Sequence, residues 1–175
     1  MPAPPDGGAG PPVSSDLLRR HRNSRSPVLI VGGTDSGRSE VAQAFHASSP
    51  LKLGALIRID CAIDEGTLSE ALQHWLTRAG RMDAANPLWP AERGTLYLES
   101  VDGLSPGSQQ LLLAFVHRCS SLSPGDESGW LGRLAAGCDE DPWDLVAQGR
   151  FLAGLADGLD KIRVELNPRR QGGAA

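Results

Sequence analysis

Short apolar runs alternate with segments of helical periodicity along the central part of the chain. Residues 28–31 are a Val, Leu and Ile run between a proline and two glycines, which is typical of a strand buried on both faces. Further strands of similar length are predicted at 56–61, 95–98, 131–136 and 162–166. Strands that alternate with helices predict a parallel sheet with right-handed crossovers and helices on both faces. The expected fold class is therefore an α/β layered domain with about five parallel strands.

Three helices are predicted between these strands, at 39–47, 67–79 and 106–119. The second has Thr67 and Glu70 in the pattern of a capping box, with Gly80 as its expected end. The third starts after Ser105 and has Pro106 at its first position. Loops are expected at 81–93 and 120–129. The side chains expected in the core include Trp75, Leu112, Phe115 and Phe151, and His46 and Cys61 are also expected to be packed.

The two ends of the chain differ in composition from the segment between them. Residues 1–13 are almost entirely Pro, Gly and Ala, which cannot bury enough surface to offset the entropy of ordering them. We expect a flexible tail over 1–26 that includes a short basic helix at 15–23, with its arginines on a solvated face. An α/β domain is expected over 27–168, and a disordered tail over 169–175.

Composition and charge exclude several classes of protein. The chain has 175 residues, a formal net charge of -4 and three cysteines. No apolar window is long enough to span a membrane, and the first residues lack the order of a secretory signal, so we expect a cytoplasmic protein. The cysteines form no CxxC pair, which argues against a disulfide framework or a zinc site. The mild acidity argues against nucleic acid as the main partner.

The residues after the first predicted strand have the spacing of a phosphate-binding loop. They are Gly32, Gly33, Thr34, Asp35, Ser36, Gly37, Arg38 and Ser39. The pattern G-x-x-x-x-G-K-[ST] places backbone N–H groups around phosphates at a helix N-terminus, and its last hydroxyl holds magnesium. Only the lysine differs, because Arg38 stands in its place. A strand before the loop and a helix after it indicate descent from a phosphate-binding loop.

Two side chains of this loop weaken the case that it still binds nucleotide. Arg38 carries a planar, bulky head where the loop lysine is a compact charge, so the exchange is not conservative. Asp35 adds a carboxylate, which at about 4 Å from a phosphate would be repelled by roughly 4 kcal/mol at an effective dielectric near 20. An Asp35 that points outward would cost little. Alternatively, Arg38 neutralises Asp35 and fills the site from within.

The strand predicted at 95–98 leads into a second motif that is also altered. Phosphate-loop ATPases end this strand in Asp-Glu, which hold magnesium and polarise the attacking water. Here the pair is Glu99 and Ser100. Glu99 could still reach a metal through its extra methylene. Ser100 has no basicity near neutral pH and cannot serve as a general base.

From about residue 27 to residue 168 the sequence resembles the AAA+ ATPase domain of bacterial enhancer-binding proteins, the sigma-54-dependent transcription activators. The resemblance lies in VLIVGGTDSGRSEVAQAFHASSP (28–50), IDCAIDEGTLSEAL (59–72) and RGTLYLESVDGLSPGSQQLLLAFV (93–116). It extends to LAAGC (134–138), similar to the strand that ends in the family's sensor residues, and to GRF (149–151). The resemblance implies the P-loop NTPase fold of the α/β part of an AAA+ domain.

The same resemblance implies that several functional positions have changed. The sigma-contacting GAFTGA loop would lie between residues 72 and 92, where this chain has an unrelated sequence. The sensor asparagine position holds Cys138, and the two arginine-finger positions correspond to Leu152 and Gly158. An arginine finger stabilises the charge of the transition state, so its loss is decisive for catalysis. The segment that resembles the family ends near Pro168, before the family's helical lid, which we therefore expect to be absent.

These departures predict a pseudo-ATPase without catalytic residues. The first hypothesis is a non-enzymatic regulatory or scaffolding module that needs no cofactor and binds a bacterial protein partner, with Trp89 and Trp143 as exposed anchors. The alternative role of these tryptophans is to fill a gap left by the missing lid. A second hypothesis is a nucleotide switch that holds ATP or ADP without turnover, with Ser39 on magnesium and Glu99 behind it. A third is a modulator of sigma-54-dependent transcription that co-assembles with intact AAA+ activators.

Overall fold

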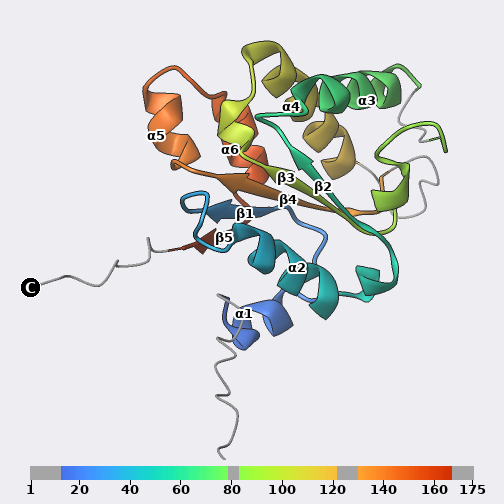
Figure 1. Cartoon of the computed structure of the whole chain (residues 1–175), viewed down its shortest axis with the longest axis vertical. Helices are drawn as coiled ribbons and strands as arrows, with labels where there is room; N and C mark the ends of the chain where they lie inside the picture. The colour runs from blue at the N-terminus through green and yellow to red at the C-terminus, as the bar shows by residue number, and fades with distance from the viewer. Residues whose placement is uncertain (1–12, 79–82, 122–129, 167–175) are drawn as a thin grey trace, which may run out of the picture.

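The five strands form one parallel sheet in the order β2-β3-β4-β1-β5 (Figure 1). A computed structural model describes residues 13–78, 83–121 and 130–166. The strands are β1 (Val28–Val31), β2 (Leu56–Asp60), β3 (Thr95–Glu99), β4 (Arg133–Cys138) and β5 (Ile162–Glu165). All four ladders between neighbours are parallel, which confirms the predicted α/β class. The order places β1 between β4 and β5.

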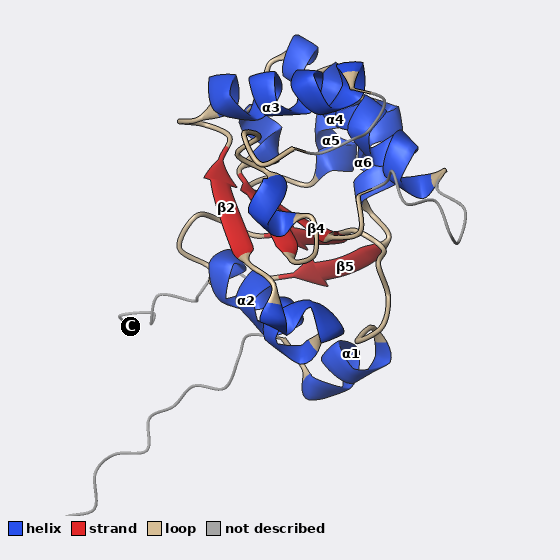
Figure 2. Cartoon of the chain, turned by 90° about the vertical axis from the view of Figure 1, so that its right-hand side faces the viewer, coloured by secondary structure: helices blue, strands red, loops and turns tan. Residues whose placement is uncertain are grey.

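The helices cover both faces of the sheet, as predicted (Figure 2). One face carries α1 (Ser15–Arg20) and α2 (Arg38–Ser48). The other carries α3 (Glu65–Thr77), α4 (Pro106–Ser120), α5 (Pro142–Ala147) and α6 (Ala153–Leu159). Three short 3-10 turns join these elements, at Pro50–Leu53, Trp89–Ala91 and Val101–Gly103.

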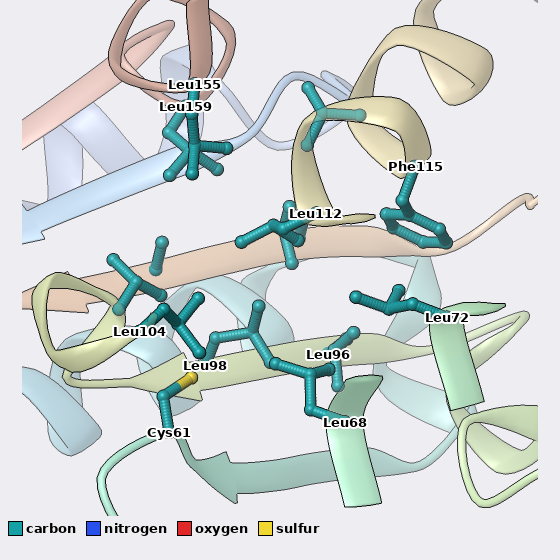
Figure 3. Close-up of a cluster of buried hydrophobic side chains, with 14 of the residues drawn as sticks. Cys61, Leu68, Leu72, Leu96, Leu98, Leu104, Leu112, Phe115, Leu155 and Leu159 are labelled. Carbon is teal, nitrogen blue, oxygen red and sulfur yellow. The ribbon is translucent and has the colours of Figure 1, made fainter. Parts of the chain in front are cut away.

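The larger part of the core lies between the sheet and the helices α3, α4 and α6 (Figure 3). Leu112 and Phe115 of α4 are buried there, as predicted, and so is Phe151. Trp75 meets Phe115 edge to face with ring centroids 4.8 Å apart, and Phe115 meets Trp130 in the same way at 5.4 Å. Such aromatic pairs add to the stabilisation that burial alone provides.

Several predicted boundaries are wrong, and each error has a local cause. The helix α3 begins at Glu65 with Asp64 as its N-cap residue, so Thr67 and Glu70 lie inside the helix and form no capping box. The fourth strand starts at Arg133 rather than at residue 131, because Leu131 is exposed before Gly132. The helices α5 and α6 were not predicted, because they are short. The predicted end at position 80 lies outside the described residues.

The segment before β1 is packed, which corrects the expected tail over 1–26. Val13 is buried, and Ser14 caps α1 by accepting a hydrogen bond from the Leu17 N–H at 3.2 Å. The buried Arg133 donates from Nη2 to the His21 carbonyl at 2.7 Å, which ties this segment to the sheet. Residues 13–26 therefore include packed structure, whereas residues 1–12 and 167–175 lie outside the described part.

The arginines of α1 lie on a solvated face, as expected. Arg19 and Arg20 both pair with Asp16 on the surface, at 2.7 and 2.9 Å. Exposed pairs of this kind contribute little to stability.

One buried side chain, Gln109, holds the start of α6 against α4, and its loss should destabilise the domain. Its Nε2 donates to the carbonyls of Leu104 and Arg150 at 3.0 and 3.2 Å, and its Oε1 accepts from the Leu152 N–H at 3.0 Å. Gln109→Leu leaves these backbone groups unpaired and should lower the free energy of unfolding by about 2 kcal/mol. Urea unfolding measures this. The exposed neighbour Gln110 is the control, and an equal loss in Gln110→Leu would contradict the assignment.

The histidine of α2 makes stability depend on pH. His46 Nδ1 lies 2.9 Å from the hydroxyl of the buried Thr95, and burial lowers the pKa of His46 below its usual value, partly offset by a hydrogen bond with the Gly54 backbone. The unfolded chain therefore binds a proton more readily than the folded one. The contribution of neutral His46 to the free energy of unfolding is fully present above about pH 6.5. It should be lost as the pH falls below that value. Urea unfolding at several pH values should show a smaller loss in His46→Gln than in the wild type, and parallel curves would contradict this.

Candidate functional site

The loop with the phosphate-binding pattern lies between β1 and α2, where the spacing of its residues predicts it. It lies at the carboxyl edge of the sheet, where ligands of open α/β folds bind. The Gly32 N–H donates to the Cys138 carbonyl at 3.0 Å, and the Ser36 N–H donates to the Gly33 carbonyl at 2.9 Å. Gly37 has φ 95°, a left-handed conformation that favours glycine. A Cβ atom at Gly32 would lie 2.6 Å from the Ser36 hydroxyl. The predicted loop is thus present as a folded unit.

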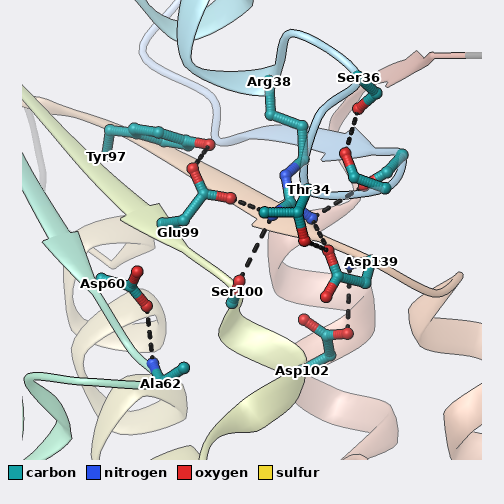
Figure 4. Close-up of polar contacts among 12 residues, drawn as sticks. Thr34, Ser36, Arg38, Asp60, Ala62, Tyr97, Glu99, Ser100, Asp102 and Asp139 are labelled. Carbon is teal, nitrogen blue, oxygen red and sulfur yellow. Dashed lines mark hydrogen bonds and ion pairs between the residues drawn. The ribbon is translucent and has the colours of Figure 1, made fainter. Parts of the chain in front are cut away.

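Arg38, which replaces the loop lysine, turns beneath the loop towards the sheet (Figure 4). Its side chain is 1% exposed. Nη1 donates to the Gly32 carbonyl at 2.8 Å and to Asp139 Oδ1 at 2.5 Å, and Nη2 forms an ion pair with Glu99 Oε1. Burial opposes the charge of Arg38, but Glu99 and Asp139 outweigh it and raise the pKa of Arg38 above its usual value. The guanidinium is therefore charged, and both of its terminal nitrogens contact protein groups, whereas its buried Nε has no hydrogen-bond partner.

Glu99, the candidate magnesium ligand, is also committed to protein partners. Its side chain is 7% exposed, and its Oε2 accepts a hydrogen bond from the Tyr97 hydroxyl at 2.5 Å. Arg58 Nη2 lies 3.6 Å from the same oxygen. Burial, followed by the hydrogen bond to Glu99 and its charge, raises the pKa of Tyr97, so the phenol remains a donor. Both oxygens of Glu99 are thus engaged, one by Arg38 and the other by Tyr97 and Arg58.

Asp139 is a member of the site that the sequence analysis missed. It follows β4, and its Oδ1 lies 3.3 Å from the Thr34 hydroxyl of the loop. The backbone N–H groups of Asp139 and Glu140 donate to Asp102 Oδ2 at 3.2 and 3.5 Å. Burial, and then the charge of Asp139, raise the pKa of Asp102. The only signal in the sequence is an acidic run at 139–141, shortly after the strand predicted at 131–136.

Asp35 belongs to the loop but is not the ion-pair partner of Arg38. Its side chain is exposed, as in the outward-pointing alternative. Arg38 pairs with Glu99 and Asp139 from beneath the loop, so the alternative in which Arg38 neutralises Asp35 is wrong. The site is filled from within, but by acidic residues that come from β3 and from the end of β4.

The hydroxyl residues of the site occupy three different settings. Ser36 donates to the Gly33 carbonyl at 2.5 Å and so closes the loop on itself. Ser39 is half-buried in the first turn of α2. Ser100 has φ 55°, a left-handed conformation that is uncommon outside glycine, and its hydroxyl lies 3.4 Å from Arg38 Nη2. The residue at the position of the catalytic glutamate therefore contributes to holding Arg38.

The two positions that the resemblance assigns to arginine fingers serve packing. Leu152 is the N-cap residue of α6 and is half-buried against the main core. Gly158 is buried, and a Cβ atom there would lie 2.9 Å from Val116 Cγ1. The sensor position, Cys138, is buried in β4, and burial raises the pKa of its thiol.

The segment that replaces the GAFTGA loop packs into the domain where the structure describes it. Asn86 donates to the Ala71 carbonyl of α3 at 2.9 Å and accepts from the Leu88 N–H at 2.9 Å. Leu88 is fully buried in the main core. Residues 83–92 are thus held against α3 and the sheet.

The two candidate anchors lie at opposite ends of the sheet. Trp89 belongs to the turn before β3 and is 41% exposed, whereas Trp143 belongs to α5, which follows β4, and is 42% exposed. Trp143 Nε1 donates to Asp160 Oδ2 at 2.9 Å. Because the strands are parallel, the two rings cannot form one patch.

The residues that the structure describes contain no cluster of three or more His, Cys, Asp or Glu residues placed to hold a metal ion. None of their helices is both long and apolar enough to span a membrane.

The sheet order and the loop after β1 define a P-loop NTPase-like domain, and comparison with known proteins gives the family. A model of the sigma-54 interaction domain matches residues 13–165. The chain therefore belongs to the sigma-54 interaction domain family, whose members are AAA+ ATPase domains of transcription regulators. This confirms the resemblance seen in the sequence.

The curated relatives are transcription regulators that are much longer than this chain. The Nif-specific regulatory protein of Rhodobacter capsulatus is 31% identical over 174 residues, which cover 93% of this chain and 30% of the relative. The phenol regulator MopR of Acinetobacter guillouiae is 27% identical over 171 residues, which cover 89% of this chain and 29% of the relative. The chain thus spans less than a third of the length of these regulators.

Solved structures share the fold. NtrX from Brucella abortus, in a complex with ATP, has a TM-score of 0.67 and 19% identity, covering 86% of this chain and 35% of NtrX. The P-loop NTPase domain of a sigma-54 transport activator from E. coli has a TM-score of 0.55 and 18% identity, covering 81% of this chain and 97% of that domain. At this identity the likeness establishes the fold alone.

Proposed function

We propose that this chain is a non-catalytic, AAA+-like module that acts as a regulatory or scaffolding protein-protein interaction domain. The observation that carries the proposal is the fully buried Arg38, which is paired with Glu99 and Asp139 beneath an otherwise preserved phosphate loop. The residues present do not fit a nucleotide with magnesium, because the cation and the carboxylate that would contact them neutralise each other.

Rearranging the site to accept phosphate would be costly. If Arg38 moved up to a phosphate, Glu99 would lose one of its partners in a buried position, and breaking a buried pair costs about 3–5 kcal/mol. A penalty of that size weakens binding by a factor of about 100 to 4,000, since each 1.4 kcal/mol is tenfold. Hydrolysis meets a further obstacle, because Ser100, Leu152 and Gly158 supply neither a general base nor a finger cation.

An interaction role agrees with what the chain retains. The sheet is complete and the helices pack on both of its faces. Leu152 and Gly158, which the resemblance assigns to arginine-finger positions, contribute to packing. Membership of the sigma-54 interaction domain family points to a partner within the sigma-54 transcription machinery. We propose intact AAA+ activators as candidate partners, with Trp89 and Trp143 as two separate anchors.

Phosphate release from ATP with magnesium tests the loss of catalysis. The matched baseline is Gly37→Val, which destroys the left-handed turn of the loop. We expect the wild type and Gly37→Val to release phosphate at the same background rate. Release by the wild type clearly above that of Gly37→Val would overturn the proposal.

A nucleotide-binding switch without hydrolysis is the second candidate, and the preserved loop backbone favours it. In this alternative the N–H groups of residues 33–39 bind the phosphates, and Ser39 holds magnesium. Equilibrium titration with a fluorescent ATP analogue separates the two candidates. Saturable binding that the double variant Gly37→Val, Ser39→Ala abolishes would support the switch, and its absence supports the scaffold.

A further inference from the structure

One carboxylate of the site, Asp139, belongs to neither phosphate-loop motif. We infer that Asp139 is an autoinhibitory residue, which holds Arg38 beneath the loop and keeps phosphate out. The inference rests on the proposed function and assigns to Asp139, beside Glu99, a part in keeping nucleotide out. We call the ion pair of Arg38 with Asp139 the clasp.

The clasp lies directly against the phosphate loop. Asp139 Oδ1 accepts from Arg38 Nη1 at 2.5 Å and lies 3.3 Å from the Thr34 hydroxyl of the loop (Figure 4). The same Nη1 donates to the carbonyl of Gly32, at the start of the loop. One carboxylate oxygen therefore joins the end of β4, the loop and the first residue of α2.

The position of Asp139 is fixed by its backbone. Its N–H and that of Glu140 both donate to Asp102 Oδ2. The residue before it, Cys138, accepts from the Gly32 N–H at 3.0 Å, which continues the β1–β4 pairing into the loop. The carboxylate of Asp139 is thus presented to the loop by the sheet itself.

Asp139 is more accessible than Glu99 to a ligand that approaches the loop. The side chain of Glu99 is 7% exposed, and it has Tyr97 and Arg58 as further partners. The side chain of Asp139 is 45% exposed, so its negative charge faces both the loop and the solvent. A phosphate that approaches the loop is therefore repelled by Asp139, and it finds Arg38 already occupied.

The chain offers a matched control for the effect of charge alone. Asp35 lies in the loop and is exposed. Among the described residues, the ion pairs of Arg38 are with Glu99 and Asp139. Asp35→Asn therefore removes one carboxylate from the loop and leaves the clasp intact.

Titration of the full chain with a fluorescent ATP analogue and magnesium tests the inference. We expect no saturable binding by the wild type up to the highest concentration of analogue used. We expect Asp139→Asn to bind the analogue with a Kd at least about tenfold below that concentration, and unlabelled ATP should displace it. Asp139→Glu keeps the carboxylate and should behave as the wild type. Asp35→Asn should, like the wild type, show no saturable binding over the same range of concentrations. The inference is overturned if Asp139→Asn shows no saturable binding of the analogue, or if Asp35→Asn binds it as tightly as Asp139→Asn does.

Two further outcomes separate this inference from the proposed function. If neither the wild type nor Asp139→Asn binds the ATP analogue, the role of Asp139 is overturned and the non-catalytic proposal stands. Tight binding by the wild type overturns both. If Asp139→Asn does not fold, NMR of the Arg38 guanidinium in the wild type replaces it. The guanidinium protons should be protected from exchange and unchanged by millimolar ATP, and an ATP-dependent shift of these signals would overturn the clasp.

Discussion

Replacing Arg38 by methionine is expected to lower the free energy of unfolding by about 3 kcal/mol. The substitution keeps an unbranched side chain in a position that is 1% exposed, but it removes the guanidinium that pairs with Glu99. Breaking a buried pair by removing one partner leaves an uncompensated charge, which is the source of the loss. The expected value lies at the lower end of the usual range, because Tyr97 and Arg58 still contact Glu99. Urea unfolding at pH 7 measures it.

A second substitution shows whether the buried charge is the cause. In Arg38→Met combined with Glu99→Gln, no buried carboxylate is left without its cation, so the double variant should recover at least about 1 kcal/mol relative to the single one. If Arg38→Met alone costs less than about 0.5 kcal/mol, the side chain behaves as a surface residue and the described pairing is wrong.

Replacing Gly94 by alanine is expected to cost about 3 kcal/mol or more, at the upper end of the range for overpacking. A Cβ atom there would lie 2.0 Å from the Ala55 carbonyl oxygen, which is backbone and cannot rotate away. The same oxygen accepts the Thr95 N–H at 2.9 Å, so relief of the clash would break the start of the β2–β3 ladder. Thermal or urea unfolding of the variant measures the loss.

The control for this glycine is Gly66 in α3, where an added Cβ atom would meet nothing within 4 Å. Gly66→Ala should raise stability by about 0.5–1 kcal/mol, because alanine loses less backbone freedom in a helix. We therefore expect Gly94→Ala to lower the free energy of unfolding and Gly66→Ala to raise it. A Gly94→Ala protein as stable as the wild type would show that the two strands do not approach so closely.

The parts of the fold that local pattern controls were predictable from the sequence. The five apolar runs gave five strands, because strands buried on both faces are continuous apolar segments. The cap of α4 by Ser105 with Pro106 behind it was also recognised. Pattern failed where the elements are short. The helix α6 holds Gly154 and Gly158, which disfavour a helix in isolation, and tertiary packing against α4 overrides that preference.

The residues of the candidate site that belong to motifs were predictable from the sequence, but the contacts between residues distant in sequence were not. The loop, Arg38, Glu99 and Ser100 follow from motif spacing. The partner Asp139 is 101 residues from Arg38 in sequence and reaches it only because β4 lies next to β1 in the sheet. The sequence showed that a cation and a carboxylate remained, but it could not show that they bind each other. The ion pairs of Arg38 with Glu99 and Asp139 support our proposal that this site no longer accepts nucleotide.

Thermal unfolding with and without saturating ATP and magnesium tests the central claim most directly. A ligand that binds only the folded protein must raise its melting temperature, by an amount that grows with its concentration over Kd. Because Arg38 and Glu99 are bound to each other, we predict that saturating ATP with magnesium changes the melting temperature by less than about 1 °C. A rise of several degrees that Gly37→Val abolishes would contradict the account.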